Sequence, residues 1–170
     1  MTPPEDSGSA PVEIEVPEMD LAGTLTDLWI ALADSQRAHG SHIYPEENRT
    51  QIREKVVRHA VDDAVLVARD DGIVGFVTFD IQTGVFEQDC ARGIVENIFV
   101  RPERRGEGIG SALLAAAERR LTARGIDVIS LEVMADNETA REFYRRAGYA
   151  PHRVKLEKPA ESDTHSKDEK

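Results

Sequence analysis

The sequence lacks the residues that a disulfide framework, a zinc cluster or a membrane span would need. Cys90 is the only cysteine among 170 residues, so neither an internal disulfide nor a multi-cysteine zinc site can form. The longest apolar runs, such as residues 112–117, are far shorter than the roughly 20 residues that cross a bilayer. The N-terminus is polar and acidic where a secretory signal has a basic start and an apolar stretch. We therefore expect a cytoplasmic protein with no membrane partner.

Positive charge is also scarce. Asp and Glu number 32 against 21 Lys and Arg, which gives a formal net charge of −11. A charge of this sign repels the phosphates of nucleic acids, so we expect no nucleic-acid partner. A cationic partner or substrate would be attracted instead.

The hydrophobic pattern predicts one α/β (α+β) domain, residues 12–158, between disordered polar tails at 1–11 and 159–170. Stretches with the period of a strand alternate with stretches that have the period of a helix. They predict a mixed central β-sheet of about six strands flanked by helices, in the order β-α-α-β-β-β-α-β-α-β. The expected strands are residues 12–16, two antiparallel strands around Asp71-Gly72, 94–100, 128–133 and 150–156. The expected helices run from Leu21 to the break at His39-Gly40, from Pro45 to Ala60, from the glycine-rich turn to Arg124-Gly125, and from Asn137 to Ala147.

A glycine-rich segment, residues 100–110, joins the fourth strand to the third helix. Glycines at positions 106, 108 and 110 let successive N–H groups point into one concavity at the positive end of the helix dipole. A phosphate group fits such a concavity, although the same glycines would also suit a tight turn that only packs the helix. The segment has neither the Gly-Lys-Ser/Thr of nucleoside triphosphate loops nor the Gly-x-Gly-x-x-Gly of dinucleotide folds.

Several sequence pieces together resemble the GCN5-related N-acetyltransferases (GNAT). The first is Arg105-x-x-Gly108-x-Gly110 after a strand ending Val100-x-Pro102, which is similar to the pyrophosphate-binding motif of that family. The others are Leu131-Glu132-Val133, Asn137 and Phe143-Tyr144-x-x-x-Gly148-Tyr149, which resemble its second conserved region. The resemblance implies the GNAT fold and an N-acetyltransferase that moves the acetyl group of acetyl-coenzyme A to a primary amine, on a small molecule or a protein. The alternatives are a non-catalytic acyl-CoA-binding module and an acyltransferase for a longer acyl-CoA.

The resemblance also implies where acetyl-coenzyme A lies. It would occupy a V-shaped gap between the fourth and fifth strands, with its pantetheine arm along the exposed edge of the fourth strand. Arginines of the loop would face the phosphates, although loop arginines are often only solvated. Asn137 resembles a family asparagine that contacts the pantetheine, and a helix cap alone would also explain it. The expected coenzyme-binding residues are Ile98, Phe99, Val100, Arg104, Arg105, Gly106, Gly108, Ile109, Gly110 and Asn137.

Three side chains are candidates for proton transfer. Tyr144 resembles the family tyrosine near the coenzyme sulfur and would act as general acid, unless it is a core residue on one stripe with Phe143. Glu96 and Glu132 each interrupt an apolar run, and a carboxylate in a sheet core is either paired or raised in pKa towards the range of a base. Both match positions that carry bases in some members of the family, and a solvent-facing position is the alternative for each.

The loop between the first two helices carries His39, His42 and Tyr44. In the family that this sequence resembles, the corresponding segment helps to cover the acceptor. No further ligands stand at metal spacing, so we expect no metal site. Residues 36–48 contain no signature from which the acceptor can be predicted.

Overall fold

The computed structural model describes residues 12–160, so the expected tail at residues 1–11 and residues 161–170 of the other tail lie outside the described residues. The strands are β1 (Glu13–Glu15), β2 (Val65–Arg69), β3 (Ile73–Gln82), β4 (Arg92–Val100) and β5 (Val128–Leu131). The helices are α1 (Ala22–Arg37), α2 (Arg49–Val61), α3 (Ile109–Ala123) and α4 (Glu138–Arg146). Short 3-10 turns, η1 (Met19–Leu21), η2 (Glu46–Asn48) and η3 (Pro102–Arg104), precede α1, α2 and the loop before α3.

The sheet is mixed, as expected. Its strands stand in the order β1-β2-β3-β4-β5. Neighbours from β1 to β4 are antiparallel, and β5 runs parallel to β4. Parallel neighbours need a long crossover, and α3 supplies it. The predicted mixed topology of the sheet is therefore confirmed.

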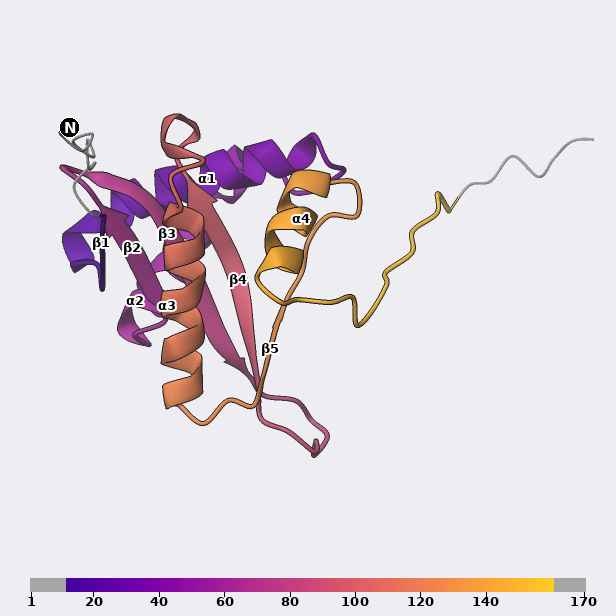
Figure 1. Ribbon diagram of the computed structural model, residues 1–170. Coiled ribbons are helices and arrows are strands. Elements are labelled where there is room, and N and C mark those ends of the chain that lie inside the picture. Colours follow the sequence, from indigo (N-terminus) through magenta and orange to yellow (C-terminus); the bar gives the residue numbers. More distant parts are fainter. Residues whose placement is uncertain (1–11, 161–170) are drawn as a thin grey trace, which may run out of the picture.

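Helices cover both faces of the sheet and bury a separate apolar cluster on each (Figure 1). On one face, Leu113 and Leu121 of α3 are fully buried against Phe79 of β3. On the other face, the Trp29 ring of α1 stacks on the Phe76 ring at a centroid distance of 6.2 Å. Burial of each such side chain stabilises the fold by about 1.5–3 kcal/mol. Among residues 12–160, every helix falls short of the length and apolar content that a bilayer crossing requires.

The β2–β3 hairpin forms where Asp71-Gly72 predicts it, but the strained residue is the aspartate. Asp71 has a φ of 58°, in the left-handed region that Asp tolerates better than most residues. The Asp70 N–H donates to the Gly72 carbonyl at 2.9 Å and closes the turn. The hairpin was predicted correctly, and the positive φ of its turn falls on Asp71 and not on Gly72.

Strand β4 contains a β-bulge at Glu96. Val95 stands opposite Phe79 on β3, and Asn97 stands opposite Thr78, the residue just before Phe79. Glu96 is therefore an extra residue with no partner on β3. Such a bulge bends its strand and re-aims the side chain that it carries.

The two parallel strands separate next to this bulge. The last pair between them joins Val95 of β4 to Leu131 of β5. Beyond that pair β4 continues to Val100, and within residues 12–160 no strand pairs with this stretch of its outer edge. Strand β5 ends at Leu131 and is paired with β4 over its whole length. The structure thus shows a free outer edge of β4 beyond Val95, and the V-shaped gap that the family resemblance implies stays a prediction.

The expected last strand, residues 150–156, does not form. From α4 to residue 160 the chain has no regular structure and runs away from the sheet (Figure 1). Pro151 has no N–H to donate to a ladder, and Val154 and Leu156 are 79% and 87% exposed. β-propensity reflects packing on a pleated, half-buried surface, and these side chains do not pack on one. The sheet therefore has five strands within residues 12–160, not six.

Candidate active site

The glycine-rich loop presents a row of unpaired backbone N–H groups at the start of α3. Gly106 and Gly108 both have a φ of +81°, a conformation that glycine adopts without steric cost. Gly108 is also the N-terminal cap residue of α3. The first backbone bond of the helix runs from the Ala112 N–H to the Gly108 carbonyl, and no acceptor within residues 12–160 takes the N–H groups of residues 106–111. Together with the helix dipole, they form a site for an anion.

Of the two loop arginines expected to face the phosphates, Arg104 is already paired with carboxylates of the protein. The Arg104 guanidinium bonds to Asp70 at 2.9 Å and to Glu107 at 2.8 Å. Its charge is therefore matched within the protein, and Arg104 holds the loop against the β2–β3 turn instead of offering an unpaired cation. Glu107 stands two residues before α3 begins and pairs with Arg104, so this contact explains an acid in the loop better than the helix dipole does.

Arg105 lies along the end of β4. Its Nε donates to the Val100 carbonyl at 3.1 Å, and its guanidinium carbon is 5.6 Å from the centroid of the Phe99 ring. No carboxylate within residues 12–160 pairs with Arg105. It is the loop arginine that remains available to a phosphate.

Most of the residues expected to bind the coenzyme follow one another along the chain from β4 to the start of α3, but the side chains of Phe99 and Ile109 are buried, so these two could offer a ligand only their backbone. Ile98, Phe99 and Val100 belong to the stretch of β4 that has no strand on its outer edge. Val100 leads through η3 into the loop with the unpaired N–H groups. A Cβ built on Gly110 would lie 3.5 Å from the Phe143 ring, which shows that α4 packs against the start of α3.

Asn137 caps α4, as predicted. Its Oδ1 accepts a hydrogen bond from the Ala140 N–H at 3.2 Å. This contact satisfies one of the free donors at the helix start. Its Nδ2 group has no partner within residues 12–160, so a contact with the pantetheine is compatible with the cap.

Tyr144 packs against the core, and its hydroxyl group is left without a partner within residues 12–160. Its ring packs against the apolar cluster beneath α3. It also meets the rings of Phe143 and Tyr149 edge-on, at centroid distances of 5.1 and 6.1 Å. Burial raises the pKa of Tyr144 to about 12, so the phenol stays protonated at neutral pH. Its hydroxyl has no hydrogen-bond partner within residues 12–160. A protonated phenol whose hydrogen is uncommitted can act as a general acid.

Glu132 does not lie in the sheet core. It follows the last residue of β5, and its side chain is exposed with no ion-pair partner within residues 12–160. The expectation of a carboxylate that interrupts a buried run is therefore wrong for this residue. It stands one residue beyond the last β4–β5 pair, at the start of the gap.

Glu96 is paired, which is one of the two alternatives that the sequence left open. Its Oε2 is 2.7 Å from Nε2 of His59 on α2, and their side chains are 29% and 7% exposed. The hydrogen bond from His59 lowers the pKa of Glu96 below its usual value, against the opposing effect of burial, and the charges of His59, Lys55 and Arg58 lower it further. Of the two outcomes that the sequence left open, a partner or a raised pKa, Glu96 therefore shows the partner, and its pKa is lowered.

His59 is the residue of this site that our sequence analysis missed. It shares the apolar stripe of α2 with Ile52 and Val56 and is buried with them. Its ring meets Trp29 edge-on at 5.9 Å. A histidine on the apolar face of a helix is expected to be buried, and a buried imidazole needs a hydrogen-bond partner. That pattern was the signal in the sequence. The sequence did not show that the partner is Glu96, 37 residues further along the chain.

The α1–α2 loop contacts segments that follow the gap. His39 Nδ1 is 3.3 Å from Asp136 Oδ1, just before α4, and His42 Nε2 is 3.2 Å from Glu157 Oε2. The Tyr44 ring is exposed beneath the Arg37 guanidinium at 4.8 Å. The loop therefore lies beside the segment that joins β5 to α4. No group of side chains within residues 12–160 could hold a metal ion.

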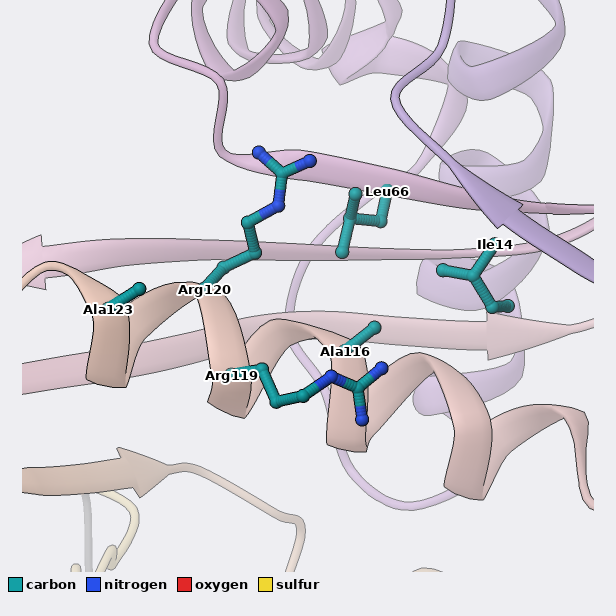
Figure 2. A pocket seen from close by; sticks show the side chains of 6 residues that line it. All are labelled: Ile14, Leu66, Ala116, Arg119, Arg120 and Ala123. Atoms are coloured by element: carbon teal, nitrogen blue, oxygen red, sulfur yellow. The ribbon is translucent and has the colours of Figure 1, made fainter.

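A separate hollow of about 260 Å³ lies on the α3 face, away from this site (Figure 2). Ile14 of β1 and Leu66 of β2 form one side of it, and Ala116 and Ala123 of α3 form the other. It contains none of the residues that we expected to bind the coenzyme or to transfer a proton.

The chain is similar to known acetyltransferases in sequence and in fold. Residues 28–149 match the model of the acetyltransferase (GNAT) family. A mycothiol acetyltransferase from Clavibacter michiganensis subsp. michiganensis is 40% identical over 129 residues, which make up 72% of this chain and 39% of that protein. This chain thus spans about two fifths of the length of these curated relatives.

Solved structures with the same fold are more distant in sequence. A GCN5-related N-acetyltransferase from Ralstonia eutropha superposes with a TM-score of 0.70 at 22% identity, over 88% of this chain and 98% of its own. An aminoglycoside N-acetyltransferase solved in complex with coenzyme A superposes with a TM-score of 0.65 at 18% identity, over 88% and 95% of the two chains. These likenesses concern the fold.

Proposed function

The chain belongs to the acetyltransferase (GNAT) family, and we propose that it transfers the acetyl group of acetyl-coenzyme A to a primary amine. The observation that carries the proposal is the free edge of β4 beyond Val95, which leads directly into a loop of unpaired N–H groups. An extended pantetheine arm can bond along such an edge, because a strand edge presents alternating donors and acceptors. The pyrophosphate would then reach the N-terminus of α3.

The chain's own residues suit the proton movements of this reaction. The amine must lose a proton before it attacks the thioester, its nitrogen then bonds to the acetyl carbon, and the departing sulfur takes up a proton. Tyr144 holds a proton that it can give to the sulfur, and solvent can return one to the phenol. Glu96 and Glu132 flank the point where the strands part, so either can receive the proton of the amine directly or through water.

The fold does not define which class of primary amine is the acceptor. Relatives of this chain carry the name mycothiol acetyltransferase, so compounds related to mycothiol belong among the acceptors to be tried. Because the chain matches only part of those proteins, other amines have equal standing. The net charge of −11 favours cationic acceptors such as polyamines over anionic ones.

The test is binding followed by turnover. We expect acetyl-coenzyme A to bind the purified chain in calorimetry, and free thiol to appear when a panel of amines, peptide N-termini and mycothiol-related compounds is added. Binding without turnover over the whole panel would favour the non-catalytic module, and the absence of binding would contradict the proposal. Turnover rates across acyl chain lengths test the remaining alternative, a longer acyl donor.

A further inference from the structure

The contact between His59 and Glu96 must contain a proton. His59 Nδ1 lies 2.7 Å from the backbone carbonyl of Lys55. A carbonyl oxygen can only accept, so Nδ1 carries a hydrogen in this geometry. The other ring nitrogen, Nε2, is 2.7 Å from Glu96 Oε2. A neutral imidazole with its hydrogen on Nδ1 and an ionised carboxylate would both be acceptors there. A bond this short therefore holds one proton between them.

The two partners differ in what they can reach. His59 is enclosed by α2, the sheet and the Trp29 ring, so its side chain cannot touch an acceptor in the gap. Glu96 is partly exposed and sits on the bulge where β4 leaves β5. Only one oxygen of Glu96 contacts His59, and within residues 12–160 the other has no partner. Any proton from the gap reaches His59 through this carboxylate.

We propose that His59 is the final site for the acceptor's proton and that Glu96 passes the proton to it. This inference rests on the proposed function and makes His59 a positioning residue, because it acts through Glu96. The structure shows the pair with its proton. The working state that comes before it lacks that proton and has a neutral imidazole beside an ionised carboxylate. An N–H bond of the acceptor ammonium breaks, and Glu96 takes the proton. A half-turn about the Cγ–Cδ bond of Glu96 presents it to Nε2 of His59, where the new N–H bond forms. The acceptor is left as a neutral amine, and the pair holds one more proton than before.

Glu96 alone would be a weak base, because its pKa is lowered. Its pairing with His59 provides a stronger one. Burial by itself lowers the pKa of His59, but the hydrogen bonds to Glu96 and to the Lys55 carbonyl and the charges of Glu96 and Asp80 outweigh it and leave that pKa above the usual value. Asp80 acts from β3, whereas Lys55 and Arg58 of α2 favour the ionised form of Glu96. The pair as a unit therefore accepts a proton at a higher pH than Glu96 alone would, which makes it the better base.

The test is a pH–rate profile with an acceptor of high pKa, such as a lysine-like amine. In the wild type, kcat/KM should rise with pH and level off once the pair is deprotonated. In His59→Gln the amide can still hold Glu96 but cannot store a proton, so the rate should follow the neutral amine and climb about tenfold per pH unit without levelling off. At neutral pH it should be about 100-fold below the wild type. His152→Gln makes the same chemical change at an exposed histidine and should keep the wild-type profile.

Two further measurements keep the outcome decisive if His59→Gln does not fold. Glu96→Gln alters the partly exposed partner and should lose the plateau in the same way. In nitrogen NMR spectra of the wild type, neutral His59 should carry its hydrogen on Nδ1 and should titrate above 6.5. A folded His59→Gln or Glu96→Gln protein with an unchanged plateau would overturn the proposal, as would a neutral His59 with its hydrogen on Nε2. If the wild type binds no acetyl-coenzyme A, that result contradicts the proposed function and not this inference. The NMR measurement does not depend on coenzyme binding.

Discussion

Tyr144 and Tyr149 are both partly buried tyrosines, but their hydroxyl groups have different surroundings. Tyr149 donates to Glu118 Oε1 at 2.9 Å, whereas Tyr144 has no partner within residues 12–160. The first hydroxyl is engaged in holding the chain after α4 to α3. The second is free to donate to a bound molecule. A difference of this kind separates a structural tyrosine from a candidate acid.

We predict that Tyr144→Phe lowers kcat by about 100-fold, a usual contribution of a general acid, while the affinity for acetyl-coenzyme A stays nearly unchanged. Loss of a hydroxyl with no partner should change the free energy of unfolding by less than about 1 kcal/mol. Kinetics, calorimetry and urea unfolding of the same preparation measure the three quantities.

Tyr149→Phe is the matched control for that substitution. It removes the same hydroxyl from the same segment, so it should lower the free energy of unfolding by about 1–2 kcal/mol through the lost bond to Glu118. Its kcat should remain near that of the wild type. Equal kcat values for the two variants would return Tyr144 to a packing role.

Glu132 is the exposed alternative to Glu96 as the first proton acceptor. Because its side chain has no partner within residues 12–160, we predict that Glu132→Gln changes the free energy of unfolding by less than about 0.5 kcal/mol. We also predict that it preserves the plateau of the pH–rate profile with a high-pKa amine. Loss of the plateau in this variant, with a normal profile in Glu96→Gln, would transfer the role of base to Glu132.

At the residue scale, the sequence identified candidates better than it identified their surroundings. The family motifs marked Tyr144, Glu96 and Asn137, and the structure gives each a setting in which the expected role is possible. The partners of Glu96 and Arg104 were not predictable, because His59 and Asp70 come from other elements and meet them only in the folded chain. The sign of the Glu96 pKa shift depends on such a partner, so it could not be read from a pattern of apolar neighbours.

At the scale of elements, the loop before α3 is the feature whose geometry can be tested most directly. Gly108 and Gly125 stand at the two ends of α3, both with a φ of +81° and with open space where a Cβ would lie. A side chain at either position suffers the same backbone strain, roughly 1–2 kcal/mol. Only Gly108 lies among the unpaired N–H groups.

We predict that Gly108→Asp abolishes binding of acetyl-coenzyme A in calorimetry, because its carboxylate would occupy and repel the place of a phosphate. Gly125→Asp should lose a similar free energy of unfolding and bind the coenzyme like the wild type. The comparison separates the loss of a site from the loss of stability. Normal affinity in a folded Gly108→Asp protein would contradict the phosphate-loop assignment.

The His59–Glu96 contact links α2 to β4 and should make stability depend on pH. The pKa of His59 is raised above 6.5, so its contribution is fully present below 6.5 and is lost as pH rises through the folded value. The pKa of Glu96 is lowered below 4.5, so its contribution is present above 4.5 and is lost as pH falls through the folded value. Between these limits both partners are charged and the contact is strongest.

We predict that the difference in unfolding free energy between the wild type and Glu96→Gln is largest between pH 4.5 and 6.5 and shrinks as pH rises above 6.5. Urea unfolding at several pH values measures it without adding salt. His152→Gln should differ from the wild type by a small amount that is constant over this range. A difference that stays the same for Glu96→Gln at every pH would show that the contact carries no proton.

The elements themselves were largely predictable, with one instructive exception. Helices α1 to α4 and strand β4 fall within a few residues of the expected bounds, and β2 and β3 flank the expected turn at Asp71-Gly72. All of these elements except α2 end close to a glycine or a proline, which makes their ends visible in the sequence. The stretch 150–156 has strand-like residues as well, but in the structure it lies on no apolar surface. A strand forms only where a neighbouring strand or an apolar surface can pair with it or cover it. The local sequence does not show whether such a neighbour exists.

For the whole molecule, charge is distributed in a way that affects the two substrates differently. The net charge of −11 creates a field that draws cations towards the protein and repels anions. Near the loop this field is offset, because Arg104 is matched by Asp70 and Glu107 while Arg105 has no acidic partner within residues 12–160. The coenzyme would meet backbone N–H groups and a local balance of charge, and the acceptor would meet the field of the whole surface.

We therefore predict that the two substrates differ in their sensitivity to salt. When ionic strength rises from about 0.1 M to about 1 M, the screening length falls from about 10 Å to about 3 Å, so long-range attraction of a polyamine should disappear. Its kcat/KM should fall several-fold, whereas kcat/KM for an amine that carries no net charge should change little. The dissociation constant of acetyl-coenzyme A should also change little, because short contacts with backbone N–H groups are screened far less than distant charges. Parallel losses for the charged and uncharged acceptors would show instead that salt acts on the fold or on the coenzyme site, and that the acidic surface does not select the acceptor.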